Sequence, residues 1–202
     1  MANDTGAYGL KPLYSRGGDN AQQVQKMYVS SSYATALFVG DPVNWNPLAA
    51  YSDTTGMHQS VVVAAAIDSG HWAGVIVGIE PIQTNLNLNY IPASTGGYVY
   101  ICTDPNMVYK VRGDGGATPT KSIVGNTAGL IATASGNTST GVSGYHLDEG
   151  TTTTPAKTQT LPLLILALHN KADNTLGINA EYEVMINTVI NTAGRYDGVL
   201  AT

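Results

Sequence analysis

The sequence predicts an all-β protein: a single jelly-roll or related β-sandwich or barrel domain with an extended N-terminal arm. Short runs of β-branched and aromatic residues recur along the chain between turn signals made of Gly, Pro, Asn and Asp. Capped windows with helical periodicity, rich in Ala, Leu, Glu and Lys, are missing. Hydrophobic residues make up 43% of the 202 residues, whereas charged residues make up only 11%. This composition excludes a disordered chain and a coiled coil, and it predicts a neutral-polar surface.

The first 25 residues are expected to form the arm. Glycine and proline interrupt every periodic run there, at Gly6, Gly9, Pro12, Gly17 and Gly18. Such a segment is more typical of an arm or a docking segment than of a core element. The sequence therefore divides into an arm over residues 1–25 and a β domain over residues 26–202.

The first half of the β domain is expected to contain four strands. Val24–Tyr33 alternates loosely, and Ala36–Val39 ends at the turn Gly40-Asp41-Pro42, because the residue before a proline avoids the helical region. The β-branched runs Val61–Ile67 and Gly74–Ile79 are separated by a short turn signal. This spacing predicts either a hairpin or two successive strands of one sheet.

The second half is expected to contain another hairpin and two long strands. Tyr98–Cys102 and Met107–Val111 flank Asp104-Pro105-Asn106, which predicts a hairpin. Leu161–Leu168 is a continuous apolar run, typical of a strand buried on both faces, with a short buried helix as the alternative. Tyr182–Ile190 is interpreted as a final strand.

Two long loops are expected within the β domain. Arg112–Gly116 forces a loop at about residues 113–122, and runs of Gly, Ser and Thr predict another at about residues 135–160. Short strands at Ser122–Val124 and Leu130–Ala134 lie near them. No repeat of roughly 20–50 residues is visible, so solenoids and propellers lose support.

Charge and cysteine content limit the partners and the compartment. Nine basic and 14 acidic residues give a net charge of −5, and the basic residues are scattered singly, so no direct nucleic-acid partner is expected. Cys102 is the single cysteine and is expected to be a small buried apolar residue of a protein made in a reducing cytosol. The first residues do not have the pattern of a signal peptide, and no apolar run approaches the ~20 residues of a membrane helix, so no membrane partner is expected.

Residue spacing predicts no metal and no cofactor. The histidines show neither the i, i+4 spacing of a helical zinc site nor a neighbouring cysteine; they are His58, His71, His146 and His169. His146 and Asp148 would share one side of a strand close to Ser143, which leaves a hydrolase as an alternative. The strand–elbow–helix setting of a serine nucleophile is absent, so we predict that the protein is not an enzyme.

Three tripeptides have weaker functional interpretations. Asp104-Pro105-Asn106 and Asp114-Gly115-Gly116 could suggest calcium ligands, but the full loop pattern with its closing Glu is absent. We interpret both as turns. Arg112-Gly113-Asp114 could mimic an adhesion motif, although a tripeptide has little specificity.

The many tyrosines are interpreted first as partly buried residues of the sheets, with a contact surface as the alternative. Twelve are Tyr, against one Phe and two Trp, and tyrosine is favoured where two proteins meet. The same tyrosines, together with Trp45 and Trp72, could instead stack on sugar rings. A carbohydrate-binding β module therefore remains an alternative.

Several blocks of sequence follow one another in an order typical of a known family. The most specific block is Ser32–Val43, which contains Tyr-Ala-Thr-Ala-Leu-Phe-Val-Gly-Asp-Pro-Val. The others are Tyr8–Pro12, Gly78–Glu80, Asp104–Tyr109, Gly125–Ala128, Ser139–Asp148, Leu164–Leu168 and Asp173-Asn174. In this order, over nearly the whole chain, the blocks resemble a family of tailed-bacteriophage virion proteins similar to capsid cement or decoration proteins.

The resemblance implies a structural protein with no catalytic residues. Such a protein binds the outside of a phage head and cements neighbouring major capsid protein subunits against DNA pressure. Self-association is also expected, with a homotrimer favoured and a dimer as the alternative. The expected location is the outer surface of the virion head, after synthesis in the host bacterial cytoplasm. The runner-up is another virion component, such as a tail or fibre-associated protein.

The arm is expected to contact the capsid. An irregular polar arm can lie across a neighbouring subunit and form many backbone hydrogen bonds, and each copy gains avidity when it joins several subunits. The candidate contact residues are Tyr8, Leu10, Lys11, Pro12, Leu13 and Tyr14.

Overall fold

The chain folds into antiparallel β-sheets, which confirms the predicted all-β class. The computed structural model describes residues 3–18, 23–45, 61–63, 72–132, 136–158, 160–187, 189–190 and 196–197. Its strands are β1 (Lys11–Ser15), β2 (Val24–Val29), β3 (Pro42–Trp45), β4 (Val61–Val63), β5 (Gly74–Ile79), β6 (Gly97–Cys102), β7 (Met107–Arg112), β8 (Thr127–Ala128), β9 (Leu130–Ala132), β10 (Tyr145–Leu147), β11 (Leu163–Leu168), β12 (Glu181–Ile186), β13 (Val189–Ile190) and β14 (Tyr196–Asp197). A 3₁₀ turn, η2, spans Lys121–Ile123.

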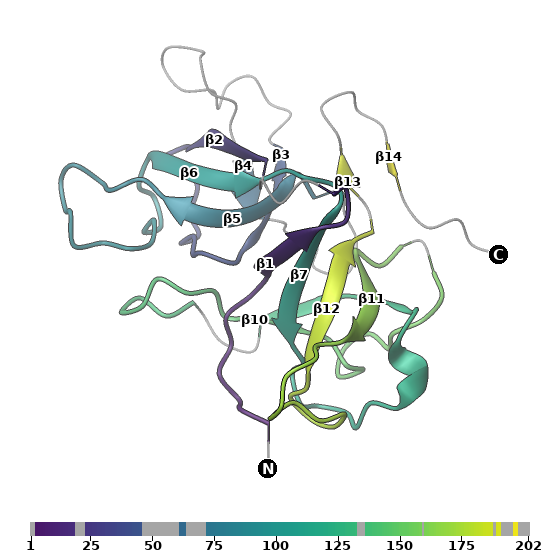
Figure 1. Ribbon diagram of the computed structural model, residues 1–202. Coiled ribbons are helices and arrows are strands. Elements are labelled where there is room, and N and C mark those ends of the chain that lie inside the picture. Colours follow the sequence, from purple (N-terminus) through teal and green to yellow (C-terminus); the bar gives the residue numbers. More distant parts are fainter. Residues whose placement is uncertain are drawn as a thin grey trace.

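Two five-stranded sheets organise the molecule (Figure 1). Sheet A has the strand order β1-β7-β12-β11-β8, and sheet B has the order β2-β6-β5-β3-β4. Two small pairs, β10-β9 and β13-β14, complete the pairing. The architecture is that of a β-sandwich or barrel, whereas the jelly-roll order of strands is not confirmed by these pairings. Within the described ranges, no helix has the length and hydropathy of a membrane span.

Side-chain alternation explains why sheet A has one buried face. On β12, Tyr182 and Val184 are fully buried, whereas Glu183 and Met185, which alternate with them, are half-buried on the opposite face. A strand places successive side chains on opposite faces, so this pattern turns one face of β12 toward the core. Tyr109 of the neighbouring β7 lies in the same core and pairs in register with Val184.

The hydrophobic interior has two parts. The larger cluster joins both sheets, because Tyr109 and Tyr182 of sheet A pack with Val75 and Cys102 of sheet B. Cys102 is fully buried, as predicted for a small apolar residue. The smaller cluster lies under sheet B, and its members are Met27, Val29, Leu37, Val43, Ile76, Ile91, Val99 and Ile101.

Both predicted hairpins differ from the observed pairing. β6 and β7 follow one another closely, but β6 pairs with β2 and β5 whereas β7 pairs with β1 and β12. The turn between them therefore passes the chain from sheet B to sheet A. β4 and β5 also do not pair with each other, because β3 lies between them. They are two strands of one sheet, which was the alternative to the hairpin.

The long C-terminal strands form where expected, but β11 buries one face and not both. β11 is a strand and not a helix, and its Leu163 and Ile165 are fully buried. Leu164 and Leu166 are only half-buried, so the prediction that β11 is buried on both faces is wrong. The predicted final strand corresponds to β12, followed by the short β13.

The long loops contain some regular structure. η2 lies at the end of the first predicted loop, and β10 interrupts the second. The predicted strand at Ser122–Val124 falls on η2 and its C-terminal cap, so that prediction is wrong.

Candidate functional site

The predicted arm is bound to its own domain over residues 3–18. β1 pairs antiparallel with β7 and forms an edge of sheet A (Figure 1). Leu10 is only 1% exposed and belongs to the larger core cluster, so the expectation that this segment contributes no core element is wrong for Leu10. Lys11, Leu13 and Tyr14 remain exposed on β1. Of the candidate contact residues, these three are the most available to another molecule.

A close backbone crossing fixes the point where the arm enters the domain. Gly9 has a φ of +67° and Gly40 a φ of +97°, both in the left-handed region that favours glycine. The Leu10 amide donates to the Gly40 carbonyl at 2.9 Å, and the Gly9 amide donates to the Tyr145 carbonyl at 3.2 Å. A Cβ on Gly9 would lie 2.5 Å from the Cβ of Ser143. Only glycine therefore fits this crossing.

The most specific block of the family resemblance forms the other half of this crossing. The Phe38 amide donates to Oδ2 of Asp41 at 2.9 Å, and the Ile76 amide donates to the Asp41 carbonyl at 2.9 Å. Asp41 is 3% exposed, and burial raises its pKa to about 6. These contacts give the Gly-Asp-Pro turn a structural role, namely to hold the arm against sheet B.

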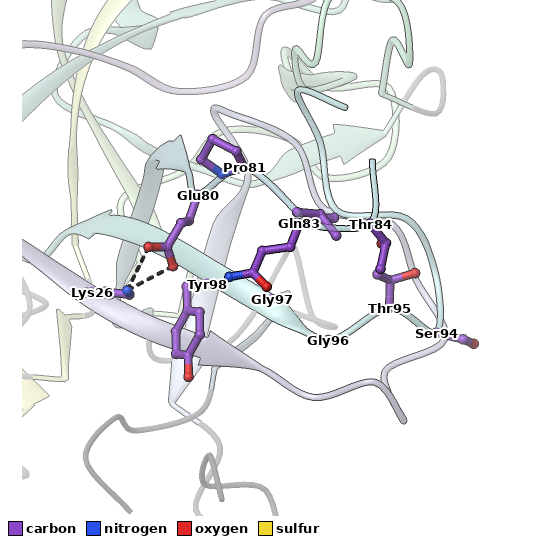
Figure 2. A pocket seen from close by; sticks show the side chains of 11 residues that line it. Lys26, Glu80, Pro81, Gln83, Thr84, Ser94, Thr95, Gly96, Gly97 and Tyr98 are labelled. Carbon is purple, nitrogen blue, oxygen red and sulfur yellow. Dashed lines mark hydrogen bonds and ion pairs between the residues drawn. The ribbon is translucent and has the colours of Figure 1, made fainter. Parts of the chain in front are cut away.

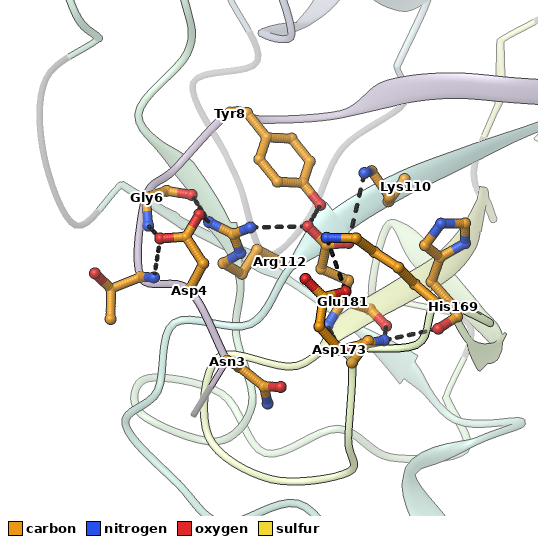
Figure 3. A network of polar contacts seen from close by, with 12 residues as sticks. Asn3, Asp4, Gly6, Tyr8, Lys110, Arg112, His169, Asp173 and Glu181 are labelled. Carbon is orange, nitrogen blue, oxygen red and sulfur yellow. Dashed lines mark hydrogen bonds and ion pairs between the residues drawn. The ribbon is translucent and has the colours of Figure 1, made fainter. Parts of the chain in front are cut away.

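A polar network, which we call the clasp, holds the first residues of the arm on sheet A (Figure 3). Its members are Asp4, Gly6, Tyr8, Lys110, Arg112 and Glu181. Arg112 donates to the Gly6 carbonyl and pairs with Asp4 at 3.2 Å, so one side chain contacts the arm at two points. Its other terminal nitrogen lies 2.8 Å from Oε1 of Glu181. The Tyr8 hydroxyl donates to the same oxygen at 3.0 Å.

Arg112 and Glu181 form the buried centre of the clasp, whereas the Asp4 side chain at its edge is 79% exposed. Arg112 is 6% and Glu181 5% exposed, and Lys110 lies 3.4 Å from Oε2 of Glu181. Burial by itself would raise the pKa of Glu181, but hydrogen bonds from Arg112 and Tyr8 and the charge of Lys110 lower it below the usual range. The Lys110 and Arg112 cations lie 5.2 and 5.0 Å from the Tyr8 ring centroid. Tyr8 is therefore committed to the clasp and is a poor candidate for capsid contact.

Further hydrogen bonds extend the clasp toward the chain start. The Asn3 amide donates to the carbonyls of Thr175 and Ile178, both at 2.9 Å. A hydrogen bond also joins the Thr5 backbone to His146. The described part of the arm is thus held at short intervals by partners far away in the sequence.

The hydrolase alternative does not fit the observed geometry. Asp148 is fully buried and its carboxylate accepts backbone amides of Gly150, Thr151, Thr152 and Thr153, so it shapes a loop. Ser143 is 2% exposed, and its hydroxyl accepts the Tyr145 amide at 3.2 Å. These side chains have structural partners and no open access to a substrate.

Two of the four histidines lie in the described part of the chain, and each has a contact with another residue. His169 lies 3.0 Å from Oε1 of Glu183, and burial lowers the pKa of His146. His58 and His71 lie outside the described residues. Among the residues that are described, no group of three or more His, Cys, Asp or Glu side chains could hold a metal ion.

The three tripeptides have structural roles. Asp104 accepts the Asn106 amide at 2.8 Å, which confirms a turn. Asp114 accepts the Glu149 amide at 3.2 Å and also binds the Thr151 hydroxyl. Because Arg112 is buried in the clasp, Arg112-Gly113-Asp114 is not displayed as an adhesion motif. Trp72 is also fully buried, so it cannot stack on a sugar, and the Trp45 side chain lies outside the described residues.

The Glu149→Gln variant is expected to lose a pH dependence of stability. Burial raises the pKa of Glu149 to about 7, even though the Tyr182 hydroxyl donates to its Oε1 at 2.8 Å. The folded-state pKa lies above the usual 4.5, so this group's contribution to stability is full below about pH 4.5 and is lost as the pH rises through about 7.

Urea unfolding across this pH window measures the effect. When the pH rises from about 4.5 to above 7, the free energy of unfolding of the wild type should fall by about 1–3 kcal/mol more than that of the variant. The glutamine carbonyl can accept the Gly115 amide, which lies 3.1 Å from Oε2 in the wild type, and its NH₂ group can donate to the Tyr182 hydroxyl oxygen. The variant should therefore fold. Equal pH slopes for the two proteins would contradict a protonated, buried Glu149.

The clasp was not predicted from the sequence. Arg112 and Glu181 stand at the ends of the apolar runs that became β7 and β12, and each looks like an ordinary strand-terminal charge. Because the chain has few charged residues, the positions of Arg112 and Glu181 at strand ends could have indicated an ion pair between them. Their register, Glu181 opposite Arg112, is visible only in the folded sheet.

Comparisons with known proteins assign no role to these residues. Scans against protein-family profiles, curated proteins and solved structures find no match to this chain. The role of the arm is therefore inferred from its exposed side chains and from the contacts that hold it.

Proposed function

We propose that this protein is a structural virion protein that binds the outside of a phage head and cements neighbouring major capsid protein subunits. The proposal starts from the resemblance of the sequence blocks to tailed-phage cement or decoration proteins. The observation that carries it is the exposure of β1, where Leu13 is 37% and Tyr14 44% exposed on an edge strand that is paired with β7.

The exposed side of β1 has the chemistry of a protein contact. Tyr14 combines apolar area with a hydroxyl that donates to Glu183 at 3.0 Å, so its ring is held in place before any partner binds. Ordering a side chain in advance reduces the entropy lost on binding. Pro12 lacks an amide donor, and the pairing with β7 shifts between Pro12 and Tyr14, which disfavours the addition of another strand at this edge. Docking would therefore use side chains.

The neutral surface suits a protein that stays attached to another protein. Charged residues make up 11% of the chain, and several of them are used internally in the clasp. An interface made of neutral hydrogen-bonding groups avoids burying unpaired charges, which is costly. In the same proposal the protein self-associates, with a homotrimer favoured, so that each assembly reaches several capsid subunits.

The Leu13→Asp/Tyr14→Ala variant tests the proposal. We expect it to lower occupancy of purified empty capsids by about tenfold or more, because truncating central apolar and tyrosine contacts often removes 1.4 kcal/mol or more of binding free energy, which is about tenfold. Cosedimentation with capsids measures occupancy, and urea unfolding checks that the fold is kept. Deleting residues 1–25 is unsuitable because it also removes Leu10 from the core.

Val124→Asp is the matched control. Val124 is 42% exposed and lies beside β8, at the opposite edge of sheet A in the strand order. It should bind capsids like the wild type. A wild type that never sediments with capsids would overturn the proposed function, and equal occupancy for the two variants would overturn the role of β1.

A further inference from the structure

An open groove lies at one end of sheet B (Figure 2), and none of its lining residues belongs to the clasp. Its volume is about 800 Å³. It is lined by residues 80–84 and 94–98, at the two ends of the β5–β6 loop, and by Lys26 of β2. The lining side chains used below are Lys26, Glu80, Gln83, Thr84, Thr95 and Tyr98. The volume falls within the range of small-molecule binding sites, which runs from roughly 300 to 1,000 Å³.

The charges of the groove cancel each other. The Lys26 ammonium lies 2.9 Å from Oε1 and 2.8 Å from Oε2 of Glu80, so the cation contacts both carboxylate oxygens. The same ammonium lies 4.3 Å from the centroid of the Tyr98 ring. The other lining residues carry no charge. A phosphate or carboxylate ligand would have to compete with Glu80 for Lys26, which disfavours an anion.

The remaining walls are polar. Pro81 and Ile82 are the only aliphatic side chains in the lining, and most of the other lining side chains carry hydroxyl, amide or charged groups. Figure 2 shows Gln83 reaching toward Tyr98 and Gly97, and Thr84 and Thr95 close together at the other end. Gly96 and Gly97 leave the floor between these groups without side chains. The groove therefore offers hydroxyls and an amide at both ends of an unobstructed floor.

Tyr98 is the aromatic side chain of the groove lining, and it is braced by Tyr28, which lies outside the lining. Its ring lies 5.6 Å from the Tyr28 ring at an interplanar angle of 58°, and the two residues pair in register on β6 and β2. A tyrosine combines a flat apolar surface with a polar tip. Sugar rings present both C–H faces and hydroxyls, and they match a wall of this kind next to amide and hydroxyl groups.

We propose that this groove binds a neutral oligosaccharide. Gln83, Thr84 and Thr95 hydrogen-bond the sugar hydroxyls, Tyr98 packs against a ring, and the Lys26–Glu80 pair supplies a donor and an acceptor without net charge. The site is distinct from the exposed side of β1, so the protein can bind a glycan while β1 contacts a shell. The inference goes beyond shell binding and does not depend on it.

The test uses the free, full-length protein on an array of neutral and anionic oligosaccharides, followed by titration of the strongest neutral ligand. We expect binding to neutral members, with a Kd at or below about 1 mM. Gln83→Ala should weaken that binding about five- to tenfold, as expected for the loss of a polar contact. Gln25→Ala, an equally simple change at an exposed position of β2, should leave the Kd unchanged.

The other outcomes overturn the proposal. No binding to any neutral oligosaccharide at about 1 mM would do so, because weaker affinity would not define a site. A preference for anionic members, strengthened by Glu80→Gln, would identify an anion site. Equal losses for Gln83→Ala and Gln25→Ala would place the ligand elsewhere. Capsids take no part in these measurements, so their failure is distinguishable from failure of the proposed function.

Discussion

Gly9→Ala is expected to be among the most destabilising single substitutions in this protein, lowering the free energy of unfolding by about 2–5 kcal/mol. The new Cβ would overlap the Gly40 carbonyl oxygen and lie 2.5 Å from the Ser143 Cβ. Backbone and a buried side chain have little room to move, so overpacking costs about 1–3 kcal/mol. The left-handed conformation, with a φ of +67°, adds about 1–2 kcal/mol for any residue with a Cβ.

Gly18→Ala separates these two causes. Gly18 has a φ of +85°, but a Cβ placed there would meet no atom within 4 Å. It should therefore show only the conformational cost of about 1–2 kcal/mol. Urea unfolding of the two variants measures the difference. If both lose the same stability, the arm does not cross the Gly40 turn as closely as the structure indicates.

Arg112→Met is expected to destabilise the protein by about 3–5 kcal/mol and to loosen the start of the arm. The substitution removes the cation that contacts Glu181, Asp4 and the Gly6 carbonyl. Breaking a buried pair by removing one partner leaves the other charge poorly compensated. Lys110 lies 3.4 Å from Glu181 and limits the loss without replacing these contacts. Unfolding by urea gives the stability, and limited proteolysis followed by mass spectrometry gives the protection of the arm.

Two further variants test whether the stability lost in Arg112→Met comes from breaking the buried charge pair. Lys171→Met breaks an exposed ion pair with Asp173, in which the side chains are 49% and 51% exposed, so it should cost much less stability than Arg112→Met. Arg112→Met/Glu181→Met removes both buried charges of the pair and should recover part of the loss. If the double variant is as unstable as the sum of the two single variants, packing rather than charge pairing is responsible.

Local patterns were sufficient for most strands. The runs that became β2, β5, β6, β7, β11 and β12 are rich in β-branched, aromatic or other apolar residues, and each contains a strand. β2 and β12 end before the predicted ends, at Val29 and Ile186. Turn chemistry was also readable, because Asp104 accepts the Asn106 amide, as a short-range turn signal implies. These features depend on residues that are close together in the sequence.

The pairing between strands could not be predicted from these local patterns. The turn after β6 looks like a hairpin turn, yet β7 leaves it to join sheet A. A turn sets only the local direction of the chain. The sheet that each strand joins depends on which buried face it must cover, and here Tyr109 packs with Tyr182 on one side of a core shared by both sheets.

The sequence by itself determined the all-β class, the low surface charge and the positions of the main strands, because these follow from local periodicity and composition. Only the tertiary structure decided that the arm is fastened to its own domain. Tyr8 and Glu181 are 173 positions apart, and Leu10 and Gly40 meet through backbone groups that every residue carries. An irregular segment rich in glycine has no periodicity that reveals such partners, so its place depends on a buried charge pair and a backbone crossing that exist only after the sheets assemble. The segment that the sequence predicts to be an extended arm is thereby an ordered edge of sheet A, on which Leu13 and Tyr14 are exposed.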